Sequence, residues 1–393
     1  MHVGGHRDAR IAIRLALALS YFNFVATGAA RVVLTLYALE LGAPASVVGI
    51  LGGLLFLFPL LLSWPIGAAA DRMGARGLLM FGSACGAVSL ALPFFFRALP
   101  VFYVAAALNG LALAFFHVTL QNVIGVMSTP EDRARNFSNF SLTGSLTNFV
   151  GPLLAGFSID TMGHAAACLV AASQSAIAVV LLLVWGHAYP PGGSAQPHAP
   201  GANTGLLDRD VVRMLVVSAM VQLGYDLFQF YLPIYAHSIG LSASAIGTIL
   251  GLVFVAALVI RGVLPVLVKK LREAVILTAA MFIAAAAFIL LPFFERGYTL
   301  GAIAFLLGLG VGCAQPMTMS LLYVMTPAGR IAEAVGLQKT VRNATHLVVP
   351  ILFGSVGAMF GVTTVFLSNA TILAVSGMLM KKAGIPDTTS SKQ

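Results

Sequence analysis

Long apolar stretches, about twelve in number and each of about twenty residues, divide this chain of 393 residues. A stretch of this length is enough for one helical crossing of a bilayer. Hydrophobic residues make up 59% of the chain and charged residues only 9%, which is outside the range of soluble globular proteins. The stretches also lack the alternation of polar and apolar residues found in membrane β-barrels. The sequence therefore predicts an all-α membrane protein with twelve transmembrane helices.

The basic residues indicate how the chain is oriented in the bilayer. If the N-terminus is cytoplasmic, seventeen Lys and Arg residues fall on the cytoplasmic side, and only Arg97 and Arg296 fall on the other. This bias predicts a multi-pass protein of the cytoplasmic (inner) membrane with both termini in the cytoplasm. It also explains the net charge of +9 by the bilayer rather than by nucleic acid. The apolar run after Arg14 continues to about Leu39, so we expect a first helix and not a cleaved signal peptide.

The chain shows no sequence signature of catalysis. Cys85, Cys168 and Cys313 all lie within apolar stretches and lack metal-ligand spacing. We find no phosphate-binding P-loop, zinc motif or nucleophile elbow. We therefore expect no enzymatic activity, no cofactor and no metal, and neither a receptor nor a lipid-modifying enzyme is favoured. Any energy for transport would come from an ion or solute gradient.

An internal repeat predicts two halves. The segment YALELGAPASVVGILGG, from Tyr37, aligns with YAHSIGLSASAIGTILG, from Tyr235. Between the halves lies a Pro- and Gly-rich segment that is typical of a flexible linker. We predict an N-terminal six-helix bundle at 1–188, a cytoplasmic linker at 189–211, a C-terminal six-helix bundle at 212–382 and a cytoplasmic tail at 383–393.

The polar segment GAAADRMGAR, between the second and third apolar stretches, carries the most specific motif in the chain. Its pattern resembles the loop signature that joins the second and third helices in the major facilitator superfamily. The resemblance implies a fold of two six-helix bundles related by a pseudo-two-fold repeat, and secondary transport by alternating access. It also implies that this loop controls conformation by pairing charges with helix ends. The predicted loop residues are Gly67, Asp71, Arg72, Gly74 and Arg76.

Polar side chains within the apolar stretches are the candidates for substrate binding. A charged side chain at the middle of a membrane helix costs about 2.5–3.5 kcal/mol, so it normally faces protein or water. The resemblance implies that helices 1, 4, 7 and 10 line a central cavity, flanked by 2, 5, 8 and 11, and these are the helices with polar stripes. The predicted substrate-binding residues are Asn23, Arg31, His117, Asn148, Arg261, Gln315, Arg342 and His346.

Asp226 is the one acidic residue deep within a predicted span, and we predict that it carries the coupled proton. One arginine can pair with it, but the spans contain three: Arg31, Arg261 and Arg342. The surplus positive charge favours an anionic substrate, because a guanidinium matches carboxylate or phosphate. Arg261 and Arg342 fall at similar estimated depth, so we predict that they jointly hold the negative group of the substrate.

Two transporter functions remain open. An arginine in helix 8 with a cation in helix 11 is similar to family members that exchange small carboxylates, such as the oxalate–formate antiporter. The alternative is a proton-driven multidrug or metabolite efflux antiporter for neutral or cationic compounds. TNFVGPLLAG, from Thr147, resembles the helix 5 signature of such antiporters, whereas Ala106 stands where they usually carry an arginine.

The leading prediction is a monomeric secondary transporter of a small organic anion, coupled to protons. The surroundings of Arg261 and Arg342 separate it from the efflux alternative. Convergence of both side chains on one cavity favours an anion site, and contacts with backbone carbonyls or loop carboxylates favour the exporter.

Overall fold

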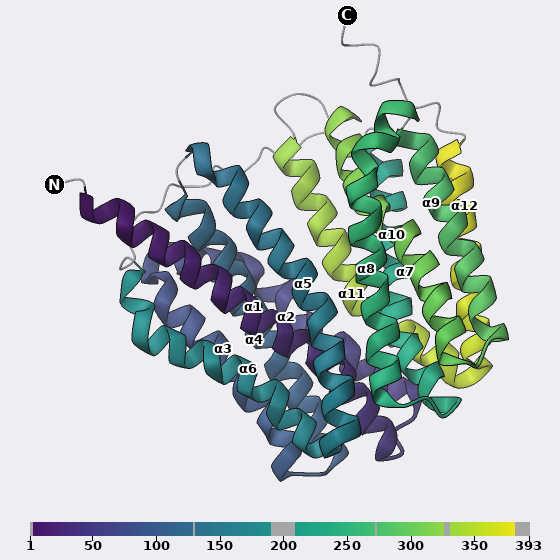
Figure 1. The fold of residues 1–393 in the computed structure, drawn as a ribbon, viewed down its shortest axis with the longest axis horizontal. Coiled ribbons are helices and arrows are strands. Elements are labelled where there is room, and N and C mark those ends of the chain that lie inside the picture. Colours follow the sequence, from purple (N-terminus) through teal and green to yellow (C-terminus); the bar gives the residue numbers. More distant parts are fainter. Residues whose placement is uncertain (1–2, 129, 190–208, 272, 326–330, 382–393) are drawn as a thin grey trace, which may run out of the picture. The chain divides into compact units, whose positions relative to one another are not determined.

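The computed structural model describes residues 3–128, 130–189, 209–271, 273–325 and 331–381. Twelve helices within these ranges are long and apolar enough to cross a membrane, which confirms the predicted fold class (Figure 1). Two short 3-10 turns accompany them. The elements are α1 (Val3–Glu40), α2 (Ala45–Met73), α3 (Ala75–Phe95), α4 (Leu99–Met127), α5 (Pro130–Met162), α6 (His164–Trp185), η1 (Gly186–Ala188), α7 (Arg209–Ser238), α8 (Ala243–Lys270), α9 (Glu273–Leu290), η2 (Leu291–Phe293), α10 (Gly297–Met325), α11 (Ile331–Phe360) and α12 (Val362–Lys381).

Contacts between residues divide the chain into two compact units. The first unit comprises Met1–His198 together with Ser242–Gly247, and the second comprises Ala199–Leu241 together with Thr248–Gln393. The boundaries predicted from the sequence, with a linker at 189–211, remain a proposal.

In the first unit, α1 packs more extensively against α5 and α6 than against its neighbour in sequence, α2. Glycines permit this contact: a Cβ atom built on Gly151 of α5 would lie 2.9 Å from the Cα of Gly28 in α1. Helix α3 packs against both α4 and α6, and these three helices lie side by side in Figure 1. Small residues thus bring the helix backbones close enough for dispersion forces to hold them within the bilayer.

A polar contact joins the ends of α1 and α6. Glu40 is the last residue of α1 and His164 the first of α6, and Oε2 of Glu40 lies 2.7 Å from Nδ1 of His164. The ring of Tyr37 stacks on the imidazole at a centroid distance of 5.6 Å. Because α1 begins near the N-terminus and crosses once, this contact lies at the membrane face opposite to the N-terminus.

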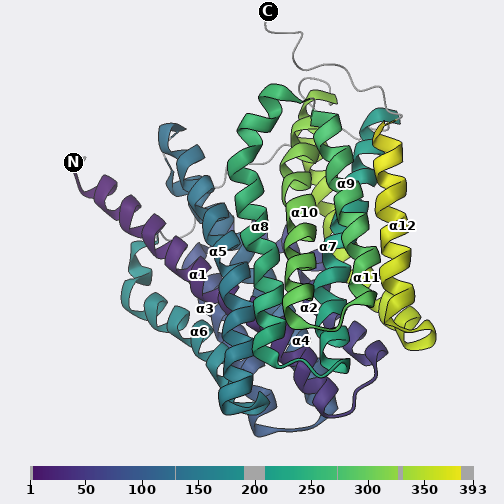
Figure 2. The same cartoon turned by 45° about the vertical axis from the view of Figure 1, so that its right-hand side comes forward.

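In the second unit, α7 packs against α11, and α9 packs against both α10 and α12, as the rotated view in Figure 2 shows for α9 and α12. Helices α8 and α10 approach each other very closely. A Cβ atom built on Gly312 of α10 would lie 2.5 Å from the Cα of Ala257 in α8. Gly312 therefore leaves its backbone accessible to side chains of α8.

The segment Gly67–Arg76 forms a shorter turn than the sequence suggested. Helix α2 continues to Met73 and α3 begins at Ala75, so that Gly74 alone separates them. Gly74 has φ +83°, and its N–H donates to the carbonyl of Ala70 at 3.2 Å. Glycine adopts this conformation without a Cβ clash, which allows the chain to reverse within one residue.

Candidate functional site

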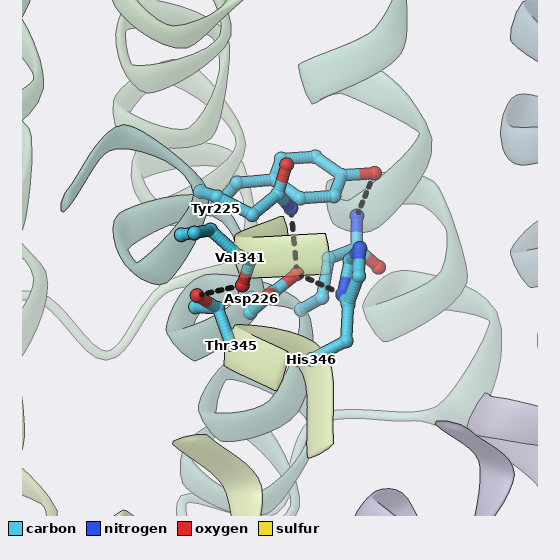
Figure 3. Close-up of polar contacts among 7 residues, drawn as sticks. Tyr225, Asp226, Val341, Thr345 and His346 are labelled. Atoms are coloured by element: carbon cyan, nitrogen blue, oxygen red, sulfur yellow. Dashed lines mark hydrogen bonds and ion pairs between the residues drawn. The ribbon is translucent and has the colours of Figure 1, made fainter. Parts of the chain in front are cut away.

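Asp226 of α7 and His346 of α11 form a buried polar pair in the second unit. Oδ1 of Asp226 lies 2.9 Å from Nδ1 of His346, and the two side chains are only 6% and 15% exposed. Gln222, one helical turn before Asp226, donates its Nε2 to the same oxygen at 3.0 Å. Figure 3 shows Asp226 and His346 with the dashed line that joins them. The structure thus brings together the predicted proton carrier and one predicted substrate residue.

The other carboxylate oxygen of Asp226 has different surroundings. Oδ2 is buried and has no hydrogen-bond partner among the residues that the structure describes. A buried acceptor without a partner is costly, so such an atom is expected to take up a proton, a water molecule or a donor from a ligand.

Arg342 lies one turn before His346 on α11 and interacts electrostatically with Asp226. An arginine in a membrane segment is costly unless an opposite charge or a polar group balances it. Asp226 supplies that charge. Of the three predicted arginines, Arg342 is therefore the one whose charge is balanced by the acidic residue of the site.

A second polar contact joins α7 and α11 two turns earlier. Gln338 donates its Nε2 to Oγ of Ser218 at 2.8 Å. Ser218 is not among the residues predicted from the sequence, although it lies on the same helical face as Gln222 and Asp226. Spacing at i, i+4 and i+8 was the available signal, but an isolated serine is common in membrane helices.

Arg261 of α8 has a backbone partner. Its Nε donates to the carbonyl of Gly312 in α10 at 3.2 Å, in the region where these helices approach closely. Arg261 makes a further interaction of its own. This contact with a carbonyl is the arrangement that the sequence analysis associated with the exporter alternative.

In the first unit, the side chains of Asn23 and His117 both have partners within that unit. The Nδ2 of Asn23 donates to Oγ of Ser83 at 3.1 Å, while its Oδ1 is buried without a partner among the described residues. His117 Nε2 lies 3.1 Å from Nε2 of Gln121. The imidazole also contacts aromatic rings, with centroids 5.5 Å from Phe24 and 6.4 Å from Phe140.

Arg31 of α1 stacks on an aromatic ring. Its guanidinium carbon lies 4.8 Å from the ring centroid of Phe56, a favourable cation–π geometry. Its Nε is buried and has no hydrogen-bond partner within the described ranges. The guanidinium thus keeps an unused donor inside the first unit.

The structure gives the remaining predicted residues no buried polar contact of this kind, within the part of the chain that it describes. Asn148 is exposed, and the side chains of Gln315, Asp71 and Arg72 lie outside the described residues. Arg76 is exposed at the start of α3, and its Nε would lie 2.9 Å from a Cβ atom built on Gly186. Among the described residues, no group of three or more His, Cys, Asp or Glu could hold a metal ion.

Comparisons with known proteins fit this architecture. The family model of the Major Facilitator Superfamily matches residues 15–350. The multidrug resistance protein MdtG of Enterobacter lignolyticus is 26% identical over 402 aligned positions, covering 96% of this chain and 95% of the relative. The staphylopine export protein of Staphylococcus aureus is 29% identical over 137 aligned positions, which cover 35% of this chain and 34% of that relative. A solved structure of a variant of the nucleoside transporter NupG, 15% identical, covers 94% of this chain and 100% of its own with a TM-score of 0.80.

Proposed function

Because this chain belongs to the Major Facilitator Superfamily, a family of membrane transporters of small molecules, we propose that it exports a small organic compound in exchange for protons. This proposal adopts the efflux alternative of the sequence analysis. It places the protein in the cytoplasmic membrane with both termini in the cytoplasm, as a monomer with bundles at 1–188 and 212–382. Alternating access and control by the segment Gly67–Arg76 are part of the same proposal.

The observation that carries the proposal is the buried pair of Asp226 and His346. A carboxylate within the membrane is retained where it has a function, and reversible protonation is the function that this pair supports best. When Asp226 is ionised, it attracts His346 and Arg342 of α11. When it is protonated, that attraction is lost, so proton binding alters the contact between α7 and α11.

Two observations favour a neutral or cationic substrate over an anion. Arg261 uses its Nε on the carbonyl of Gly312, and the charge of Arg342 is balanced by Asp226. Asp226 therefore offsets the charge of Arg342, while Arg261 keeps its charge but commits one of its donors to a backbone carbonyl instead of a substrate. The relatives named for multidrug resistance and staphylopine export support the outward direction of transport.

Reconstituted transport tests the proposal. The purified protein is placed in proteoliposomes with an imposed pH gradient, and movement of the organic cation ethidium is followed by fluorescence. We expect gradient-driven transport by the wild type and none by the Asp226→Asn variant, which keeps the size of the side chain but cannot ionise. Asp132→Asn, at a carboxylate that is 47% exposed and paired with Arg135, is the matched control and should transport normally. Gradient-driven transport by Asp226→Asn would overturn the assignment of the proton site.

Transport of a small organic anion, the leading prediction from the sequence, remains a second candidate. The buried Nε of Arg31 without a partner in the described structure favours it, because an anion would supply the missing acceptor. Oxalate and ethidium in parallel assays separate the two functions. Oxalate transport that is lost in Arg31→Gln, with no transport of ethidium, would establish the anion function.

A further inference from the structure

Six polar side chains of α7 and α11 face one another in a continuous series, which we name the α7–α11 seam. It consists of Ser218, Gln222 and Asp226 on α7, facing Gln338, Arg342 and His346 on α11. In each set the residues follow at i, i+4 and i+8, and therefore lie on one helical face. The pairs at the two ends are in contact: Gln338 with Ser218 at 2.8 Å and His346 with Asp226 at 2.9 Å. Gln222 and Arg342 stand at the matching positions between them, and both interact with Asp226.

The seam extends from one membrane face to the middle of the bilayer. The membrane span of α7 is Leu215–Ser238, so Ser218 lies near its beginning and Asp226 near its centre. Gln338 precedes the span of α11, which begins at Thr340. Eight residues of helix correspond to about 12 Å, roughly the distance from a membrane face to the midplane. Ser218 and Gln338 are half-buried, whereas Asp226 is buried.

Beyond Asp226 the positions at the spacing of the seam are apolar, and the polar contact that follows between the two helices is made by Tyr231, whose hydroxyl donates to the carbonyl of Phe353. The next positions at the same spacing are Phe230 on α7 and Pro350 on α11, and both are buried. These side chains can neither donate nor accept a proton. The residues at the spacing of the seam are therefore polar on one side of Asp226 and apolar directly beyond it, as expected for an access path that opens to a single membrane face.

We propose that the α7–α11 seam is the path by which Asp226 exchanges protons with the membrane face on which the chain begins. Protons would pass between Asp226 and the solvent along the hydroxyl and amide groups of Ser218, Gln222 and Gln338 and the water held by them. This path lies within the second unit. The inference rests on the proposed function, in which Asp226 is the proton carrier.

Among the helices that pack against α7, one supplies the ionisable groups that face Asp226 in the described ranges. Among the described residues, those that interact with its carboxylate are His346 and Arg342, both on α11. Helices α10 and α12 also pack against α7, and their spans Gly297–Ala314 and Val362–Leu379 contain no Asp, Glu, Lys, Arg or His. On release, the carboxyl O–H bond of Asp226 breaks, the proton moves to water in the seam, and the carboxylate regains its contact with His346. No redox partner is required.

Blocking the seam tests the proposal directly. Gln338→Leu and Ser218→Val remove the polar groups at its mouth but leave Asp226 and His346 unchanged. Thr345→Val is the matched control, because the hydroxyl of Thr345 donates to the carbonyl of Val341 within α11 and not to α7, as Figure 3 shows for the part of the chain that the structure describes. Ser218→Thr is a second control, because Thr has the size of Val but keeps the hydroxyl. It separates the effect of losing the hydroxyl from the effect of a larger side chain.

The readout is the rate at which Asp226 gains or loses its proton after a pH jump. It is followed by infrared absorption of the protonated carboxyl group, which Asp226→Asn identifies by removing the band. We expect Gln338→Leu and Ser218→Val to slow this rate about tenfold, equivalent to about 1.4 kcal/mol in the barrier, roughly one hydrogen bond. Thr345→Val and Ser218→Thr should keep the wild-type rate, and ethidium binding should be unchanged in all four variants.

The outcomes distinguish the two proposals. Wild-type rates in both blocking variants would overturn the seam as a proton path and leave the proposed function intact. A carboxyl band that does not change with pH, or that survives Asp226→Asn, would overturn Asp226 as the proton carrier itself. Equal slowing in the Thr345→Val control would show a general effect of altering α11 and would also contradict the seam.

Discussion

The contact between Asp226 and His346 makes a quantitative prediction about stability. Replacing His346 by Phe keeps a ring at this position but removes the nitrogen that lies 2.9 Å from the carboxylate. Breaking a buried charge pair in a soluble protein costs about 3–5 kcal/mol. Polar contacts within membranes are weaker, averaging about 0.6 kcal/mol with a maximum near 1.7, because the inserted but unfolded chain also finds partners. Gln222 and Arg342 still stabilise the carboxylate in the variant. We therefore expect a loss of about 1–2 kcal/mol.

A double-mutant cycle measures this interaction. Unfolding free energies in detergent are compared for the wild type, Asp226→Asn, His346→Phe and the double variant. The expected coupling is about 1–2 kcal/mol at neutral pH. It should decrease in acid, because protonation of Asp226 removes the charge that attracts His346. A coupling near zero at neutral pH, or one that does not change with pH, would refute the reasoning that the contact depends on an ionised Asp226 and responds to protons.

Three further predictions follow from other contacts. Gly312→Val should prevent α10 from approaching Ala257 of α8, since even a Cβ would lie 2.5 Å from its Cα, and the variant should lose folded protein in size-exclusion chromatography. Asp71→Asn should reduce transport but leave membrane insertion intact, as measured by transport per amount of inserted protein; normal transport would contradict a role of the turn in conformational change. Arg31→Lys should lose stacking on Phe56 and destabilise the protein by about 0.5–1 kcal/mol in thermal unfolding, and an unchanged melting temperature would contradict a structural role of that contact.

The sequence predicted the membrane fold well because that fold depends on local composition. Every backbone group within the bilayer must be paired inside its own helix, so each apolar stretch has essentially one structure available. The turn at Gly74 was also predictable from the motif. Its length was not, because continuation of α2 through Asp71 and Arg72 to Met73 depends on the conformation of a single glycine.

The candidate site was predicted only in part. Asp226 was recognisable because no other acidic residue lies so deep in a span, and its spacing relative to Gln222 placed both on one face. Its pairing with His346 depends on the register between α7 and α11, which lie 120 residues apart in the chain. The carbonyl partner of Arg261 could not be predicted for a related reason. The guanidinium reaches the backbone of α10 at Gly312, where the missing side chain lets α8 and α10 approach closely.

The packing of α1 has a consequence for biosynthesis. This helix is made first, yet its most extensive partners are α5 and α6, which leave the ribosome last among the helices of the first unit. Until they arrive, Arg31 and Asn23 must be sheltered by Phe56, Ser83 or the insertion machinery, and Glu40 must wait for His164. The first unit therefore closes only when its sixth helix has been inserted. A nascent chain that stops after α4 would expose to lipid the face of α1 that packs against α5 and α6, and would be a substrate for membrane quality control.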